Sequence, residues 1–110
     1  MTLETTNRQA SEQTKAAKII VHAVAVEYAV TDDAMRKKGR TATIAEARNV
    51  AMYLIRQITR ASYPDTAAFL GRPNHKSAQV AWKAVDVKKD RDPHFKARLA
   101  RLTQSCKEGL

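Results

Sequence analysis

The chain has 110 residues, with twenty lysines and arginines against eleven aspartates and glutamates, a formal net charge of +9 and a hydrophobic content of 44%. This size allows one domain with a modest core, and the hydrophobic content excludes a chain that is disordered by composition. No apolar run approaches the roughly 20 residues of a membrane-spanning helix, and the polar N-terminus lacks the profile of a signal peptide.

Helix breakers are few, with three glycines and three prolines, and alanine is abundant. This composition favours helix over strand, so we expect an all-α fold. The single cysteine, Cys106, cannot form an internal disulfide. A cytoplasmic location follows as the plain expectation.

Residues 1–11 are polar, and we expect them to form a flexible N-terminal tail before a single domain over residues 12–106. The first helix is expected to begin at Ser11 and to run to about Tyr28. Its apolar stripe, read from a spacing of three to four residues, consists of Ile19, Ala23, Val26 and Val30.

Two helix starts follow. Thr31 precedes two aspartates and has the pattern of an N-cap with acidic residues in the first turn, in a short helix that we expect to end at Gly39. Thr43 and Glu46 have the spacing of a capping box at the start of a long helix. The predicted buried face of this long helix is Ile44, Ala47, Ala51, Leu54, Ile55 and Ile58.

Three arginines of the long helix, Arg48, Arg56 and Arg60, fall within an arc of roughly 100°. They could form a stripe that tracks phosphates. Solvated cations on an amphipathic helix are the alternative interpretation.

The next segment predicts a helix-turn-helix. Ser62 marks a helix start with Pro64 in the first turn, and Gly71 ends that helix after Leu70. Asn74 is then a suitable N-cap for a second helix. In a helix-turn-helix the second helix can enter the major groove of DNA.

The second helix has two distinct faces. One face is apolar, with Ala78, Ala81, Trp82 and Val85 at i, i+3, i+4 and i+7. We interpret Trp82 as a core residue rather than a stacking platform for single strands. The other face displays His75, Lys76, Gln79 and Lys83. Asp92 and Pro93 are expected to cap and start a terminal helix, with its apolar residues at Phe95, Leu99 and Leu102.

Asn74, His75 and Lys76 lie at the end of the second helix that usually meets base edges. Asn can bind adenine through two hydrogen bonds, Lys can reach the acceptors of guanine, and His can donate or contact a thymine methyl. The alternative is that Asn74 only caps the helix and that His75 satisfies a local backbone group.

The basic charge by itself leaves three interpretations open: a nucleic-acid partner, an anionic membrane surface, or a solvated face. Catalytic patterns are absent from the sequence. His22, His75 and His94 lack the spacing of zinc ligands, and no Gly-rich phosphate loop occurs. We therefore expect no enzymatic activity, no metal and no cofactor.

Three blocks of the sequence, within about residues 18–87, resemble the C-terminal DNA-binding domain of the bacterial chromosomal replication initiator DnaA. The first runs from Ala47 to Arg56 and is similar to the family's Ala/Pro-Arg-x-x-Ala-Met-x-Leu helix. The second is Thr59-x-x-Ser62-x-Pro64, and the third is His75-x-Ser77-x-x-x-Ala81.

The resemblance implies a small helical bundle that binds a short AT-rich box in double-stranded DNA. It places the family's minor-groove arginine on Arg40. The implied phosphate contacts are Arg48, Arg56, Tyr63 and Pro64. The implied major-groove readers are Asn74, His75 and Lys76, with Ser77 beside them, and we add Gln79 from the same exposed face.

Two departures from the family pattern matter. The usual Arg-Asp-His-Thr-Thr is replaced by residues 73–77, in which Asn74 stands for Asp. Asp accepts from cytosine whereas Asn prefers adenine, which points to a different preferred box. The family's initiators also carry an ATPase module that this sequence lacks.

We therefore expect a free-standing box-binding domain, nucleoid-associated in the cytoplasm, that regulates replication or transcription or competes with an initiator. A protein-binding adaptor and a fragment of a full-length initiator are the alternatives. The polar start at Met1 favours an independent reading frame.

Overall fold

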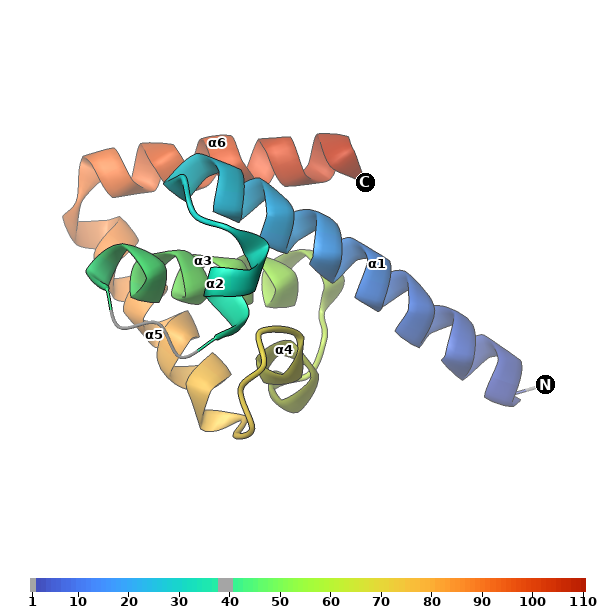
Figure 1. Cartoon of the computed structure of the whole chain (residues 1–110). Coiled ribbons are helices and arrows are strands. Elements are labelled where there is room, and N and C mark those ends of the chain that lie inside the picture. Colours follow the sequence, from blue (N-terminus) through green and yellow to red (C-terminus); the bar gives the residue numbers. More distant parts are fainter. Residues whose placement is uncertain (1, 38–40) are drawn as a thin grey trace.

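A computed structural model describes residues 2–37 and 41–110. These residues form six helices and no strand, which confirms the predicted all-α fold (Figure 1). The helices are α1 Thr2–Tyr28, α2 Asp32–Arg36, α3 Ala42–Thr59, α4 Tyr63–Phe69, α5 Lys76–Arg91 and α6 Pro93–Gly109. None of the helices in this described part is long and apolar enough to cross a membrane.

Helix α3 is the centre of the bundle. It packs against α1, α2, α4 and α5, while α6 lies along α1 (Figure 1). Of its predicted buried face, Ala47, Ala51, Leu54 and Ile55 are buried, which confirms them, whereas Ile44 and Ile58 are half-buried. Because neighbours surround α3, further residues that the one-sided pattern omitted are also buried, namely Val50, Met52 and Tyr53.

Helix α1 differs from its prediction in its start and in its buried face. It begins at Thr2, well before the expected start at Ser11, and no glycine or proline interrupts the segment between them. The expected apolar stripe was wrong at Ile19 and Val26, which are 38% and 67% exposed, whereas Ala23 and Val30 are partly buried and pack against the core. The buried residues are instead Ala17, Ile20, Val21, Val24, Ala25 and Tyr28.

The reason for the misplaced stripe is local composition. Residues 19–26 are apolar at every position except His22, so the spacing rule allows more than one stripe. Contacts with α3 and α6 decide which one is buried.

The cap of α2 is confirmed, because the Thr31 hydroxyl accepts a hydrogen bond from the Ala34 amide at 3.0 Å. The predicted stop at Gly39 lies outside the described residues. The predicted capping box of α3 was wrong: Thr41, not Thr43, is the N-cap and accepts from the Ile44 amide.

Glu46 does not fold back onto the start of α3, because its carboxylate is used in a network between helices. It accepts a hydrogen bond from the Tyr28 hydroxyl at 2.7 Å and binds the Lys88 ammonium. Arg98 Nη1 lies 3.8 Å from the same carboxylate and also pairs with Glu27. This network joins α1, α3, α5 and α6 through one carboxylate.

The second half of the chain follows its prediction closely. Ser62 caps α4, and the Asp92 carboxylate caps α6 by accepting from the His94 and Phe95 amides. The predicted apolar residues of α5 and α6 are buried except for Trp82, which is half-buried. Trp82 stacks on Tyr53 with 4.3 Å between ring centroids, so its predicted place at the core is confirmed.

Cys106 lies on α6 and is fully buried. Burial raises the pKa of its thiol to about 11, because the apolar surroundings disfavour the thiolate. The thiol is therefore neutral and shielded when α6 is packed on the bundle.

Candidate nucleic-acid interface

The turn between α4 and α5 is fastened to the end of α2. Gly71 has φ of +68°, in the left-handed region that favours glycine. A Cβ at this position would lie 2.8 Å from the backbone oxygen of Arg36. Gly71 therefore meets two requirements at once, a left-handed backbone and close contact with α2.

Two arginines strengthen this junction. Arg72 Nη2 donates to the backbone oxygens of Arg36 at 3.1 Å and Lys37 at 3.0 Å. Arg48 Nε donates to the Met35 oxygen at 2.7 Å, and Arg48 Nη2 donates to the Lys37 oxygen at 2.5 Å. Both guanidinium groups thus satisfy carbonyls at the C-terminal end of α2, where a helix leaves its acceptors without partners.

Arg48 is only 8% exposed, which is unusual for a charged residue. Burial lowers the pKa of Arg48, and the positive charge of Arg72 lowers it further. The predicted stripe of Arg48, Arg56 and Arg60 is therefore wrong as a single exposed feature. Arg48 is buried, Arg56 is half-buried and Arg60 is exposed.

Arg56 and Tyr63 form a cationic, aromatic surface beside the start of α4. The Arg56 guanidinium lies 3.7 Å from the Tyr63 ring centroid, and its Nη1 donates to the Ala61 oxygen at 2.8 Å. Pro64 is exposed in the first turn of α4. These residues line or border a groove formed by Arg56, Gln57, Arg60, Tyr63 and Trp82.

The predicted base readers gather at the N-terminal end of α5. Asn74, His75, Lys76 and Gln79 are exposed there, and Ser77 is half-buried. Asn74 Oδ1 accepts from the Lys76 amide at 2.9 Å, so Asn74 does cap α5, although the N-cap position by backbone geometry is His75. Within the described residues, neither the Asn74 amide nitrogen nor the His75 ring makes a hydrogen bond, which leaves both groups available to a ligand.

A second groove joins the reader end of α5 to α3 and to the α4–α5 turn. It is lined by Arg48, Asn49, Met52, Arg72, Lys76, Ser77 and Val80. Arg40, the predicted minor-groove residue, lies outside the described residues. The structure therefore places Lys76 and Ser77 of α5 beside Arg48. Tyr63 and Pro64 lie in the first turn of α4, and Arg56 of α3 lies over the Tyr63 ring.

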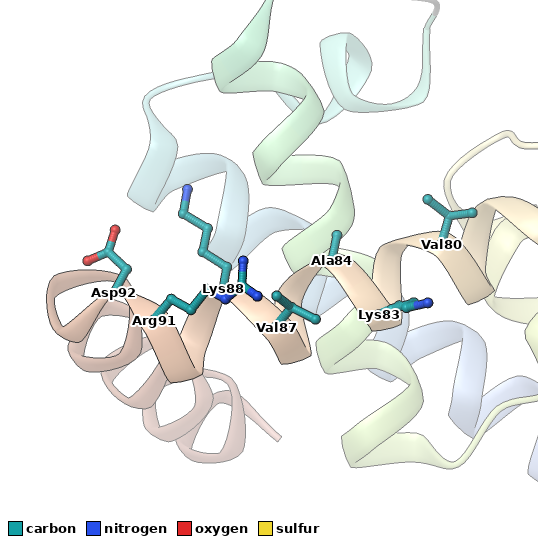
Figure 2. Close-up of a pocket in the computed structure, with 7 residues that line it drawn as sticks. All are labelled: Val80, Lys83, Ala84, Val87, Lys88, Arg91 and Asp92. Atoms are coloured by element: carbon teal, nitrogen blue, oxygen red, sulfur yellow. The ribbon is translucent and has the colours of Figure 1, made fainter.

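The sequence patterns missed an apolar ridge on α5. Val80, Ala84 and Val87 follow one another along the helix, with Lys83 and Arg91 beside them, and line a shallow groove (Figure 2). Val80 is 64% exposed and Val87 is 40% exposed. Their spacing of i, i+4 and i+7 was visible in the sequence, but the buried stripe of Ala78, Ala81 and Val85 already accounted for an apolar face.

Comparison with known proteins gives one consistent match. Residues 17–85 match the family described as "Bacterial dnaA protein helix-turn-helix". The chain is 34% identical over 83 residues to the chromosomal replication initiator protein DnaA of Aliarcobacter butzleri, which covers 76% of this chain and 19% of that protein. It is 33% identical over 88 residues to the same-named protein of Wolinella succinogenes, covering 80% of this chain and 20% of that protein.

A solved structure is also similar. The crystal structure of a DNA replication initiation factor superposes with a TM-score of 0.82 and 29% identity, over 97% of this chain and 32% of that one. The present chain spans about a fifth of the length of the two curated relatives it matches.

Proposed function

Because the chain belongs to the bacterial DnaA helix-turn-helix family, we propose that it binds double-stranded DNA by inserting the N-terminal end of α5 into the major groove. The observation that carries this proposal is the exposed group of Asn74, His75 and Lys76 at the start of a helix held by α4. The matched family domain is a DNA-binding domain rather than a catalytic one.

The residue roles extend this proposal. Asn74, His75, Lys76, Ser77 and Gln79 read base edges. Arg56, Tyr63 and Pro64 contact phosphates beside the start of α4. Arg40 enters an AT-rich minor groove. Arg48 acts mainly by holding α2 against the α4–α5 turn, because two of its nitrogens already donate to backbone oxygens; a phosphate contact through its remaining Nη1 stays a prediction.

Salt dependence tests the DNA proposal most directly. Each lysine or arginine that neutralises a phosphate releases counterions and contributes about −0.9 to the slope of log affinity against log salt concentration. We expect a steep negative slope for a duplex that carries the preferred box, measured by fluorescence anisotropy across a salt series. A flat dependence would remove duplex DNA from the proposal and favour a protein-binding adaptor.

At a finer level, we propose that the domain recognises a short AT-rich box and acts at nucleoid sites as a regulator of replication or transcription, or as a competitor of an initiator. The similarity to proteins named chromosomal replication initiators supports a replication context. The match covers only about a fifth of each of those proteins, so it is equally consistent with a fragment of such an initiator.

Selection of bound sequences from a random duplex pool would define the box. Competition against a full-length initiator on that box then separates the roles. Displacement of the initiator at matched concentrations supports a competitor, whereas simultaneous occupancy of neighbouring boxes contradicts it.

A further inference from the structure

We propose that Val80 reads the C5 methyl group of a thymine in the major groove, as a specificity residue in addition to the polar readers. The inference rests on the proposed DNA-binding function and names one chemical group that the site recognises. It begins from the 64% exposure of a large apolar side chain within the surface assigned to DNA.

The orientation of Val80 is set by the helix. Successive residues of an α-helix are turned by about 100°, so Val80 points roughly 140–160° away from Ala78 and Val85. Ala78 and Val85 are buried against the bundle. Val80 therefore projects from the outer side of α5, the side that would face a bound duplex.

Lys76 shares this side of the helix. Lys76 and Val80 are four residues apart, so they are neighbours one turn apart on one face. Both line the groove that also contains Arg48 and Arg72. A duplex contacted by Lys76 would therefore meet Val80 at an adjacent base pair.

The chemistry of the major groove leaves one partner for a valine. The base edges present hydrogen-bond donors and acceptors, which an isopropyl group cannot satisfy, and the thymine methyl is the apolar group among them. Contact between the valine and this methyl removes apolar surface of both from water. A thymine at that position is therefore favoured over cytosine and over uracil.

Val87 provides a matched control. It lies on the same ridge, seven residues further along α5, and is 40% exposed (Figure 2). Two helical turns correspond to about 10.5 Å along the axis, so Val87 lies further from the reader end. Substitution of Val87 removes a similar apolar group from the same helix without touching the proposed contact.

The experiment uses the selected box and replaces its thymines one at a time by deoxyuridine, which lacks only the C5 methyl. For the unmodified protein we expect at least one position at which deoxyuridine weakens binding by about fourfold, the size expected for one buried methyl-sized group. In Val80→Ala this difference should shrink at that position, because two of the three side-chain carbons are removed, whereas Val87→Ala should keep it. Thermal unfolding of both variants checks that the fold is intact.

Each outcome decides the proposal. A smaller methyl effect in Val80→Ala, with its full retention in Val87→Ala, supports it. An unchanged methyl effect in Val80→Ala, or no methyl effect at any thymine of a box that is still bound, overturns the role of Val80 but leaves DNA binding in place. Absence of any salt-dependent duplex binding overturns the proposed function as well.

Discussion

Asn74 illustrates how one side chain can serve the fold and the ligand together. Its Oδ1 accepts from the Lys76 amide and caps α5, while its amide nitrogen has no hydrogen-bond partner within the described residues. Oδ1 has a second lone pair, so the cap and a paired contact with adenine are compatible.

Replacement of Asn74 by Asp should change the preferred base at one position rather than abolish binding. Aspartate offers only acceptors, which suit the cytosine amino group, and it caps helices as well as asparagine does. We expect a shift in preference of roughly 1–3 kcal/mol in a panel of single base-pair substitutions. An unchanged base profile for Asn74→Asp, His75→Ala and Lys76→Ala would mean that this end of α5 does not read sequence.

At the scale of elements, the sequence predicts helix ends well where the end depends on a capping side chain. Thr31, Ser62 and Asp92 were correctly identified as caps, because a cap bonds to a backbone amide two or three residues away. Thr43 was chosen wrongly because Thr41 offers the same hydroxyl two residues earlier. In all these cases the outcome depends on a few neighbouring residues.

Which side chains are buried could not be predicted from the sequence where burial depends on residues far away in the chain. The choice between the two apolar stripes of α1 is made by α3 and α6. The burial of Arg48 depends on carbonyls 11 and 13 residues earlier in the chain. The roles of the base and phosphate contacts remain predictions, because they concern a ligand rather than the fold.

The junction of α2 with the helix-turn-helix gives a prediction about coupling between Arg48 and Arg72. Arg48→Met should lower the free energy of unfolding by roughly 1–3 kcal/mol, because the buried Met35 oxygen loses its side-chain donor. Arg72→Met should cost less, because Arg72 is more exposed.

The double variant should lose more than the sum of the two single losses, by about 0.5 kcal/mol or more. Both residues donate to the Lys37 oxygen, so only the double variant removes both side-chain donors from it. In addition, each single variant removes the repulsion between the two cations, so the sum of the single effects counts this stabilising gain twice, whereas the double variant gains it once. Denaturant unfolding of the four proteins measures this difference. Additive losses would show that the two arginines act independently.

At the scale of the whole molecule, the Glu46 network holds four helices together and makes stability depend on pH. Burial disfavours the charged carboxylate, but hydrogen bonds from Lys88 and Tyr28 and the charges of Lys88 and Arg98 outweigh it and lower the pKa of Glu46 from its ordinary 4.5. A carboxyl group whose pKa is lower in the folded state stabilises the fold above its unfolded pKa. This contribution is lost as the pH falls through the folded value.

Glu46→Gln should therefore lower the free energy of unfolding by roughly 1–2 kcal/mol at pH 7, with the difference from the unmodified protein shrinking below about pH 4.5. Thermal unfolding between pH 3 and pH 7 measures it. Glu12→Gln, at an exposed position of α1, is the matched control and should have little effect. If the loss of unfolding free energy in Glu46→Gln were constant across this pH range, the ionised carboxylate of Glu46 would not be the cause of the stabilisation.

The buried thiol of Cys106 is a built-in probe for opening of the bundle around α6. Cys106 is the only cysteine, and it is fully buried, so a reagent that modifies thiolates can reach it only after the packing around α6 has opened. The labelling rate therefore measures how often the packing around α6 opens. A single residue, Asp92, separates α6 from α5. Comparison of the labelling rate of Cys106 with and without DNA therefore tests whether a ligand bound to α5 changes the stability of the packing around α6.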